Sequence, residues 1–278
     1  MCRLGLKLVP LLVATLAATS ASAQNQFSGV TDAMEALAKS SGSSQWAAVM
    51  YLADHPEEAV PQLFRVLENK EAGWVYASAA LVRTKDARVL PFLLQLLGDN
   101  LYVKEADGSR MEFGLGTKNG CFVIPNMLGR VVAQALGELG DKRAIDTLWD
   151  AVNRGDAGVR HSAYAALYAL GGLSLDELFD LAKEGSDGAA DIIEEIGSRS
   201  IHSDTGFAIR LFDRIIAEIS KDAYNVAWAH FWKMRCFEIL KEYDNALREC
   251  HEVMKFTKYE NLLSQAREAE LRMSEKKP

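Results

Sequence analysis

A helix–break–helix pattern that occurs twice is the feature of this sequence that most constrains its fold. The stretch LGELGDKRAIDTL, residues 136–148, has apolar side chains at helical spacing on both sides of a Gly-Asp pair. A similar stretch, LYALGGLSLDEL, follows at a distance of about 30 residues and starts at Leu167. Gly140 and Gly171 stand where the first helix of each copy should end, because glycine accepts the left-handed conformation common at helix ends. Asp141 is placed to cap the helix that follows.

Further copies extend the pattern on both sides. Asp86-x-Arg88 repeats the spacing of Asp141-x-Arg143, an earlier copy starts at Trp46, and a fainter one starts at Ala189. Each copy is a pair of short helices with one apolar stripe and small residues where helices must approach closely. A single pair cannot bury its apolar stripe alone, whereas stacked neighbours complete a continuous core. The repeat therefore predicts an all-α fold, an α-solenoid of helical pairs.

The best-preserved copy resembles the HEAT-like repeats of the phycobilin-lyase type. The resemblance rests on Leu139-Gly140-Asp141-x-Arg143-Ala144 and on Asp156-x-x-Val159-Arg160, and it extends over residues 44–197. It implies a HEAT-like solenoid over residues 24–200. It also implies an alternative function, a lyase- or chaperone-like protein acting on a chromophore or a thiol, with Cys121 as the candidate thiol.

Residues 99–127 interrupt the repeats and lack a helical period. Asp107-Gly108 is typical of a hairpin turn, and the flanking stretches LYVKEA and RMEFGL alternate well enough for two short strands. Insertions of this size project from one face of a solenoid. Two interpretations stay open: a hairpin that touches a partner, or a mobile surface loop.

The region after residue 200 has longer, more aromatic helices and resembles a tetratricopeptide repeat. Tyr243, Ala246 and Leu247 match that family's pattern, while Lys233 and Met234 depart from it. The resemblance implies tetratricopeptide-like helices over residues 201–278, ending in a polar-faced capping helix.

In tetratricopeptide repeats the first helix lines a concave binding face. The resemblance therefore implies a partner-binding groove made of Trp228, Phe231, Arg235, Glu238 and Ile239. Two aromatic rings with an arginine have the composition of a binding hot spot. The alternative is that Trp228 and Phe231 are core residues, because aromatic side chains at helical spacing are usually buried.

The first 23 residues read as a cleaved signal peptide. Arg3 and Lys7 precede a short apolar run, and Ala21-Ser22-Ala23 is a small-x-small cleavage pattern. The apolar run, residues 8–18, is shorter than the roughly 20 residues that span a bilayer. An uncleaved interfacial anchor is the alternative. Cleavage after Ala23 predicts a periplasmic or secreted protein, and export counts against the lyase alternative, since pigment attachment takes place inside cells.

Charge and motifs exclude several classes of function. The formal net charge is −7, and cleavage would remove two basic residues more, whereas nucleic acid binding needs a basic surface. No phosphate-binding glycine loop and no Gly-x-Ser-x-Gly elbow is present. The expectation is a protein without enzymatic activity or cofactor.

Four residues could in principle ligate a metal, namely His230, Cys236, Cys250 and His251. Their spacing lacks the close pairs typical of zinc sites, so no metal is expected. Cys236 and Cys250 lie on either side of a predicted helical turn, where an antiparallel hairpin could bring them close. A disulfide between them and two buried thiols are both consistent with this spacing.

These observations favour an exported scaffold or adaptor of the bacterial cell envelope that binds a protein or peptide partner. A purely structural spacer is the remaining alternative. The identity of the partner does not follow from the sequence.

Overall fold

Helices alternate with short turns along almost the whole described chain. The structure is a computed structural model, and it describes residues 26–39, 43–99, 117–118, 121–122, 127–219, 223–256 and 258–276. The predicted signal peptide, residues 1–23, lies outside this part. None of the described helices has a stretch long and apolar enough to cross a lipid bilayer.

The described chain divides into two compact units, Met1–Leu170 and Gly171–Pro278. The sequence analysis placed a boundary at residue 200, where the helices become longer and more aromatic. That division remains a prediction. In the first unit the helices are α2 (Val30–Lys39), α3 (Ser43–Ala53), α4 (Pro56–Glu68), α5 (Trp74–Thr84), α6 (Val89–Asp99), α7 (Met127–Leu139), α8 (Ile145–Arg154) and α9 (Ala157–Leu170), with a short 3₁₀ turn η2 (Lys142–Ala144).

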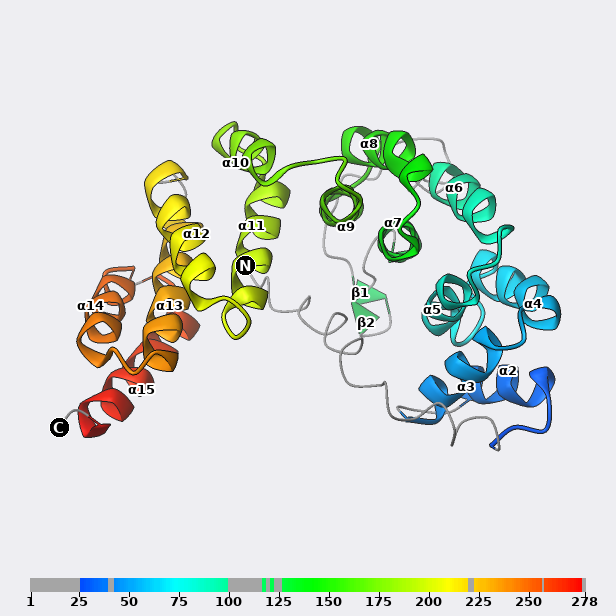
Figure 1. Ribbon diagram of the computed structural model, residues 1–278, viewed down its shortest axis with the longest axis horizontal. Coiled ribbons are helices and arrows are strands. Elements are labelled where there is room, and N and C mark those ends of the chain that lie inside the picture. The colour runs from blue at the N-terminus through cyan, green and yellow to red at the C-terminus, as the bar shows by residue number, and fades with distance from the viewer. Residues whose placement is uncertain are drawn as a thin grey trace. The chain divides into compact units, whose positions relative to one another are not determined.

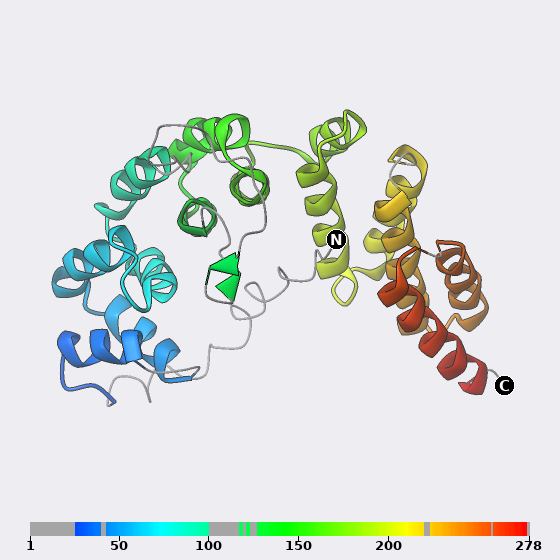
Figure 2. The same cartoon turned by 180° about the vertical axis from the view of Figure 1, so that it is seen from behind.

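The first unit is built of helical pairs stacked in two rows. Figure 1 shows α5, α7 and α9 along the inner row and α4, α6 and α8 along the outer row, and the view from behind in Figure 2 shows the same two rows. Helices of one row pack on each other, α3 on α5, α5 on α7, and α7 on α9. The core of this unit is made of Leu, Val and Ala side chains that are almost completely buried, such as Leu63, Leu93 and Leu148. The predicted fold class, an α-solenoid of helical pairs, is confirmed.

The Asp-x-Arg motif has the same geometry in two successive pairs. Asp86 Oδ1 accepts from the Arg88 backbone N–H at 2.8 Å, and its carboxylate holds the guanidinium through Nε and Nη2. Asp141 repeats each of these contacts with Arg143, the backbone bond measuring 2.9 Å. The side-chain bond from the arginine lowers the pKa of both carboxyls to about 2. The motif is thus a turn clamp that begins the second helix of a pair.

Glycines end and align the helices where the repeat predicted them. Gly140 and Gly171 have positive φ values of 78° and 70°, which side-chain-bearing residues rarely adopt. Gly137 serves a different purpose, because a Cβ placed there would lie 2.9 Å from the Cβ of Ala166 on α9. Two small residues therefore allow α7 and α9 to pack in direct backbone contact.

Two short strands lie in the insertion between α6 and α7. β1 (Thr117–Lys118) pairs antiparallel with β2 (Cys121–Phe122), in the register Thr117 opposite Phe122. The hairpin predicted around Asp107-Gly108 lies outside the described residues.

Six helices lie in the described part of the second unit. They are α10 (Leu175–Lys183), α11 (Asp187–Ser200), α12 (Thr205–Glu218), α13 (Ala223–Ile239), α14 (Tyr243–Met254) and α15 (Glu260–Lys276). Helix α13 packs on α11, α12, α14 and α15, so neighbours cover most of its circumference. This central position explains why no single face of its sequence is polar.

Candidate functional site

The side chains on different faces of helix α13 contact different neighbouring helices. Ala227, Phe231 and Met234 belong to a buried cluster shared with α14 and α15. Ala229 and Cys236 are buried as well but lie outside that cluster. One face remains partly open to solvent, between the sides that contact α11 and α15.

This partly open face is a continuous row along the helix, which we term the α13 stripe. Successive residues of an α-helix are about 100° apart, so spacings of four, four, three and four keep five side chains within one face. All five are partly or clearly exposed. The α13 stripe consists of Tyr224, Trp228, Trp232, Arg235 and Ile239.

Three aromatic rings form the N-terminal part of the stripe. The rings of Trp228 and Trp232 stack with centroids 6.0 Å apart, and Tyr224 meets Trp228 edge-on at 6.2 Å. Trp232 Nε1 donates to Glu194 Oε1 on α11 at 2.9 Å, which fixes the orientation of that indole. Rigid aromatic rings present contact area at a low entropic cost, a property of binding hot spots.

A carboxylate held by two arginines forms the C-terminal part of the site. Glu238 accepts from Arg235 Nη1 at 2.6 Å and from Arg272 Nε, on α15, at 2.8 Å. The Glu238 side chain is only 11% exposed, whereas that of Arg235 is 42% exposed. The bond to Glu238 raises the pKa of Arg272. Glu238 therefore joins α13 to α15, and Arg235 faces solvent.

The five groove residues predicted from the tetratricopeptide resemblance lie on one side of α13 but have different environments. Ile239 is exposed, and Arg235 and Trp228 are half-buried. Phe231 is 6% exposed and packs in the core, as the alternative interpretation held for that residue, and Glu238 is engaged by both arginines.

Sequence reasoning missed Tyr224 and Trp232 as members of this face. Tyr224 lies four residues before Trp228, and Trp232 four residues after it, so helical spacing alone could have identified both.

The opposite side of α13 carries a mostly buried charge network. Lys233 Nζ lies 2.8 Å from Asp213 Oδ1 on α12 and 2.7 Å from Glu249 Oε1 on α14. The second oxygen of Glu249 is 2.7 Å from His230 Nδ1. Burial raises the pKa of the Glu249 carboxyl, but its bonds to His230 and Lys233 outweigh burial and leave that pKa lowered. The network joins α12, α13 and α14 through one ammonium group, that of Lys233.

The residues considered as metal ligands do not gather. His230 contacts Glu249, while His251 Nε2 lies 3.0 Å from Glu270 on α15. Among the described residues no group of three His, Cys, Asp or Glu side chains is arranged to hold a metal ion.

Cys236 and Cys250 are free, buried thiols in the described chain. Of the two predicted states, the structure therefore has two thiols and not a disulfide. Cys250 belongs to the cluster between α13, α14 and α15, where its Sγ donates to the Ala266 carbonyl at 3.1 Å, and Cys236 lies outside that cluster. Burial raises the pKa of both thiols to about 11. Neither thiol is activated as a nucleophile.

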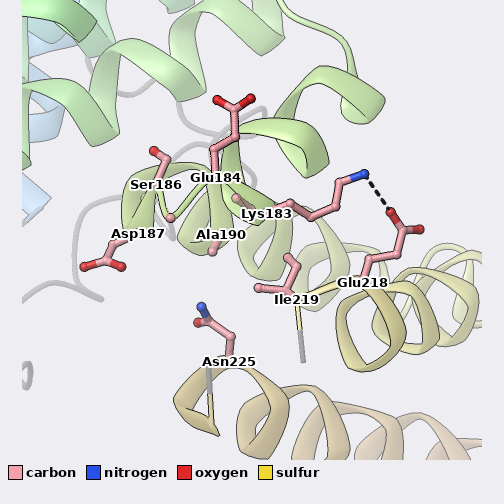
Figure 3. Close-up of a pocket in the computed structure, with 10 residues that line it drawn as sticks. Lys183, Glu184, Ser186, Asp187, Ala190, Glu218, Ile219 and Asn225 are labelled. Atoms are coloured by element: carbon pink, nitrogen blue, oxygen red, sulfur yellow. Dashed lines mark ion pairs between the residues drawn. The ribbon is translucent and has the colours of Figure 1, made fainter. Parts of the chain in front are cut away.

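A hollow of about 550 Å³ lies within the second unit, where the α10–α11 turn faces the end of α12 and the start of α13 (Figure 3). Lys183 reaches across its edge to Glu218 at 3.4 Å, so its charge is matched. Glu184 and Asp187 make the remaining rim acidic. This lining lacks the convergent set of apolar and polar groups found in small-molecule sites.

These features define the class of protein: a helical-repeat scaffold with extended surfaces. Residues 130–152, which include most of α7 and α8, match the family model described as PBS lyase HEAT-like repeat. Residues 130–152 thus form a HEAT-like repeat, as the Leu-Gly-Asp-x-Arg motif indicated. Comparison with curated proteins and with solved structures gave no match. The tetratricopeptide resemblance of the second unit remains a prediction.

Proposed function

We propose that this protein is an exported, non-enzymatic scaffold of the bacterial cell envelope that binds a partner protein through the α13 stripe. HEAT-like repeats are of a protein-interaction scaffold type, which supports the general role. The predicted signal peptide supports export. The α13 stripe supports the choice of surface.

One observation carries the proposal. The α13 stripe combines fixed aromatic rings with the arginine Arg235, whose side chain is 42% exposed, and ends in Ile239, which is 38% exposed. Tryptophan, tyrosine and arginine are the residues most enriched in binding hot spots. Interface cores are also more apolar than ordinary protein surface. The stripe is therefore suited to a protein partner.

Export is tested separately from binding. The chain is expressed in a bacterium, the periplasm is released by osmotic shock, and the mass of the recovered protein is measured. We expect a chain that begins at Gln24 in the released fraction. A chain that keeps residues 1–23 and stays with the cytoplasm or the membranes would overturn the export part of the proposal.

Binding is tested by placing a photo-crosslinking amino acid at Ile239. Arg267 is the matched control position, because it is also exposed and lies on another helix, α15. In native envelope, we expect a defined crosslinked species from position 239 and none from position 267. Equal labelling from both positions would favour a structural spacer. Labelling only from a third probe within residues 99–127 would move the binding surface to the insertion.

A further inference from the structure

Charged side chains are distributed unequally between the two rows of the first unit. The inner helices α3, α5, α7 and α9 contain three arginines and one carboxylate, namely Arg83, Arg130, Arg160 and Glu138, whereas the outer helices α4, α6 and α8 contain two arginines and six carboxylates. Asp156, in the turn before α9, acts on Arg130. Even with this carboxylate included, the inner row has a net positive charge in a protein whose formal net charge is −7. Charge complementarity therefore favours an acidic partner for this row.

Arg83 belongs to a group of three side chains in the inner row, Trp46, Tyr76 and Arg83, which we term the Trp46 cluster. The Arg83 guanidinium carbon lies over the Trp46 ring, 5.3 Å from its centroid, and the Tyr76 ring meets Trp46 edge-on at 5.8 Å. Arg83 Nη1 also donates to the Ala79 carbonyl at 3.1 Å. These contacts hold the guanidinium against the indole. The cluster thus combines tryptophan, tyrosine and arginine, the three residue types most enriched in binding hot spots.

The Trp46 cluster is open to solvent. On α5, Tyr76 and Arg83 lie within about 60° of one another around the helix axis, and they point away from Ala77 and Leu81, which are buried. Each of the three side chains of the cluster is partly exposed. A partner can therefore reach the cluster without unfolding the helical pair.

The cluster contains a cation but no carboxylate. Within the described chain the polar and ring contacts of Arg83 are the Ala79 carbonyl and the Trp46 ring, and α3 and α5 contain neither Asp nor Glu. Glu138, on α7, accepts from Gln134 at 2.9 Å. A guanidinium has five N–H donors, so Arg83 keeps donors that a ligand can use.

We infer that the inner row of the first unit is a second binding surface, at which the Trp46 cluster holds an acidic segment of another protein. An Asp or Glu side chain of the segment pairs with Arg83, because arginine is suited to bidentate contact with carboxylates. An apolar side chain of the same segment contacts the exposed part of the Tyr76 ring.

The spacing within the cluster sets the spacing within the segment. Tyr76 and Arg83 are seven residues apart, which is about 10 Å along α5. An extended chain covers this length with about three residues. The acidic residue and the apolar residue should therefore be about three positions apart. Nucleic acid is the less suitable polyanion, because the chain as a whole is acidic and lacks a basic surface of the required extent.

The test uses synthetic peptides and the full chain. A display library of nine-residue peptides is selected on the immobilised protein, and selected peptides are then made with blocked ends and a fluorescent label. We expect an Asp or Glu about three positions from an apolar residue. Replacing that Asp or Glu by Asn or Gln should weaken binding about tenfold or more.

Variants of the protein locate the effect. Arg83→Met keeps an apolar stem over Trp46 but removes the donors, so it should abolish the preference for Asp over Asn, whereas Arg83→Lys should retain part of it. The control Arg65→Met changes an arginine of the outer row whose side chain is 64% exposed, and it should leave the affinity unchanged. Thermal melting of each variant separates loss of binding from loss of folding.

Four results would count against the inference. A preference for Asp over Asn that survives in Arg83→Met would overturn it. Short single-stranded DNA that displaces the peptides, and that Arg83→Met also weakens, would indicate a site for polyanions in general. A dimer that Arg83→Met dissociates would identify a second copy of this chain as the occupant. If every selected peptide is weakened by Ile239→Ser and none by Arg83→Met, the inference fails and the proposed function of the α13 stripe stands.

Discussion

At the scale of single residues, the Asp141–Arg143 clamp should weaken in acid. In the folded protein the pKa of the Asp141 carboxyl is about 2, below the ordinary value of 3.8. The stabilising contribution of the clamp is therefore present above about pH 4 and is lost as the pH falls toward 2. In an NMR titration from pH 6 to pH 3, the Asp141 carboxyl signal should scarcely move. The Arg143→Ala variant keeps the backbone bond but loses the side-chain bond, which is the larger cause of the lowered pKa, so the same signal should begin to move at a higher pH. A titration near pH 4 in both proteins would show that the clamp does not form in solution.

The carboxylate of Glu249 should contribute more to stability than that of Glu252, which is more exposed. Glu249→Ala leaves His230 without its acceptor and leaves Lys233 with Asp213 alone in a mostly buried place, so we expect a loss of about 3 kcal/mol in unfolding free energy. Glu252→Ala removes only an exposed pair with Lys255 and should cost less than about 1 kcal/mol. Urea unfolding of the two variants measures both values, and equal losses would mean that the network is open to solvent.

At the scale of helices and their contacts, two glycines should respond in opposite ways to the same change. Gly137→Ala places a methyl group against Ala166 and should destabilise the protein by about 1–3 kcal/mol, because backbones must move apart. Gly98→Ala, near the end of α6, meets nothing within 4 Å and should be neutral or stabilise by up to about 1 kcal/mol through helix propensity. Chemical denaturation compares them. A harmless Gly137→Ala would contradict close packing of α7 on α9.

Local signals in the sequence predicted the elements of the first unit well. The Asp-x-Arg clamp and the glycines at positions 140 and 171 act within a few residues of chain, so their geometry follows from local sequence. The close approach of Gly137 to Ala166 followed less directly, because the small residues indicated a contact without naming its partner.

The candidate site was predicted only in part, and the reason is physical. Helix α13 packs on four other helices, so apolar residues occur around most of its circumference and their period does not indicate a single buried face. Phe231 and Trp228 look alike in such a sequence, but one is in the core and the other lies on the stripe. Distinguishing them required the positions of α11 and α15.

At the scale of the whole molecule, the stacking of helical pairs in a row predicts which helices a destabilising substitution affects. Each pair in the first unit contacts its immediate neighbours, so stability there should be a sum of local and nearest-neighbour contributions. Hydrogen exchange of the Gly137→Ala variant should therefore quicken most in α7, α8 and α9, and less in α2 and α3. Uniform quickening across the first unit would mean that it unfolds as one cooperative block instead.

The turn clamp has a consequence for how a chain of this kind can change in length. Asp86 binds Arg88 and Asp141 binds Arg143, so each clamp is closed within three consecutive residues and needs no charge from another helical pair. A recombination event whose ends fall in two such turns would add or delete a whole pair while leaving every clamp intact. Gene duplication, or a protein engineer, can therefore lengthen the first unit one pair at a time.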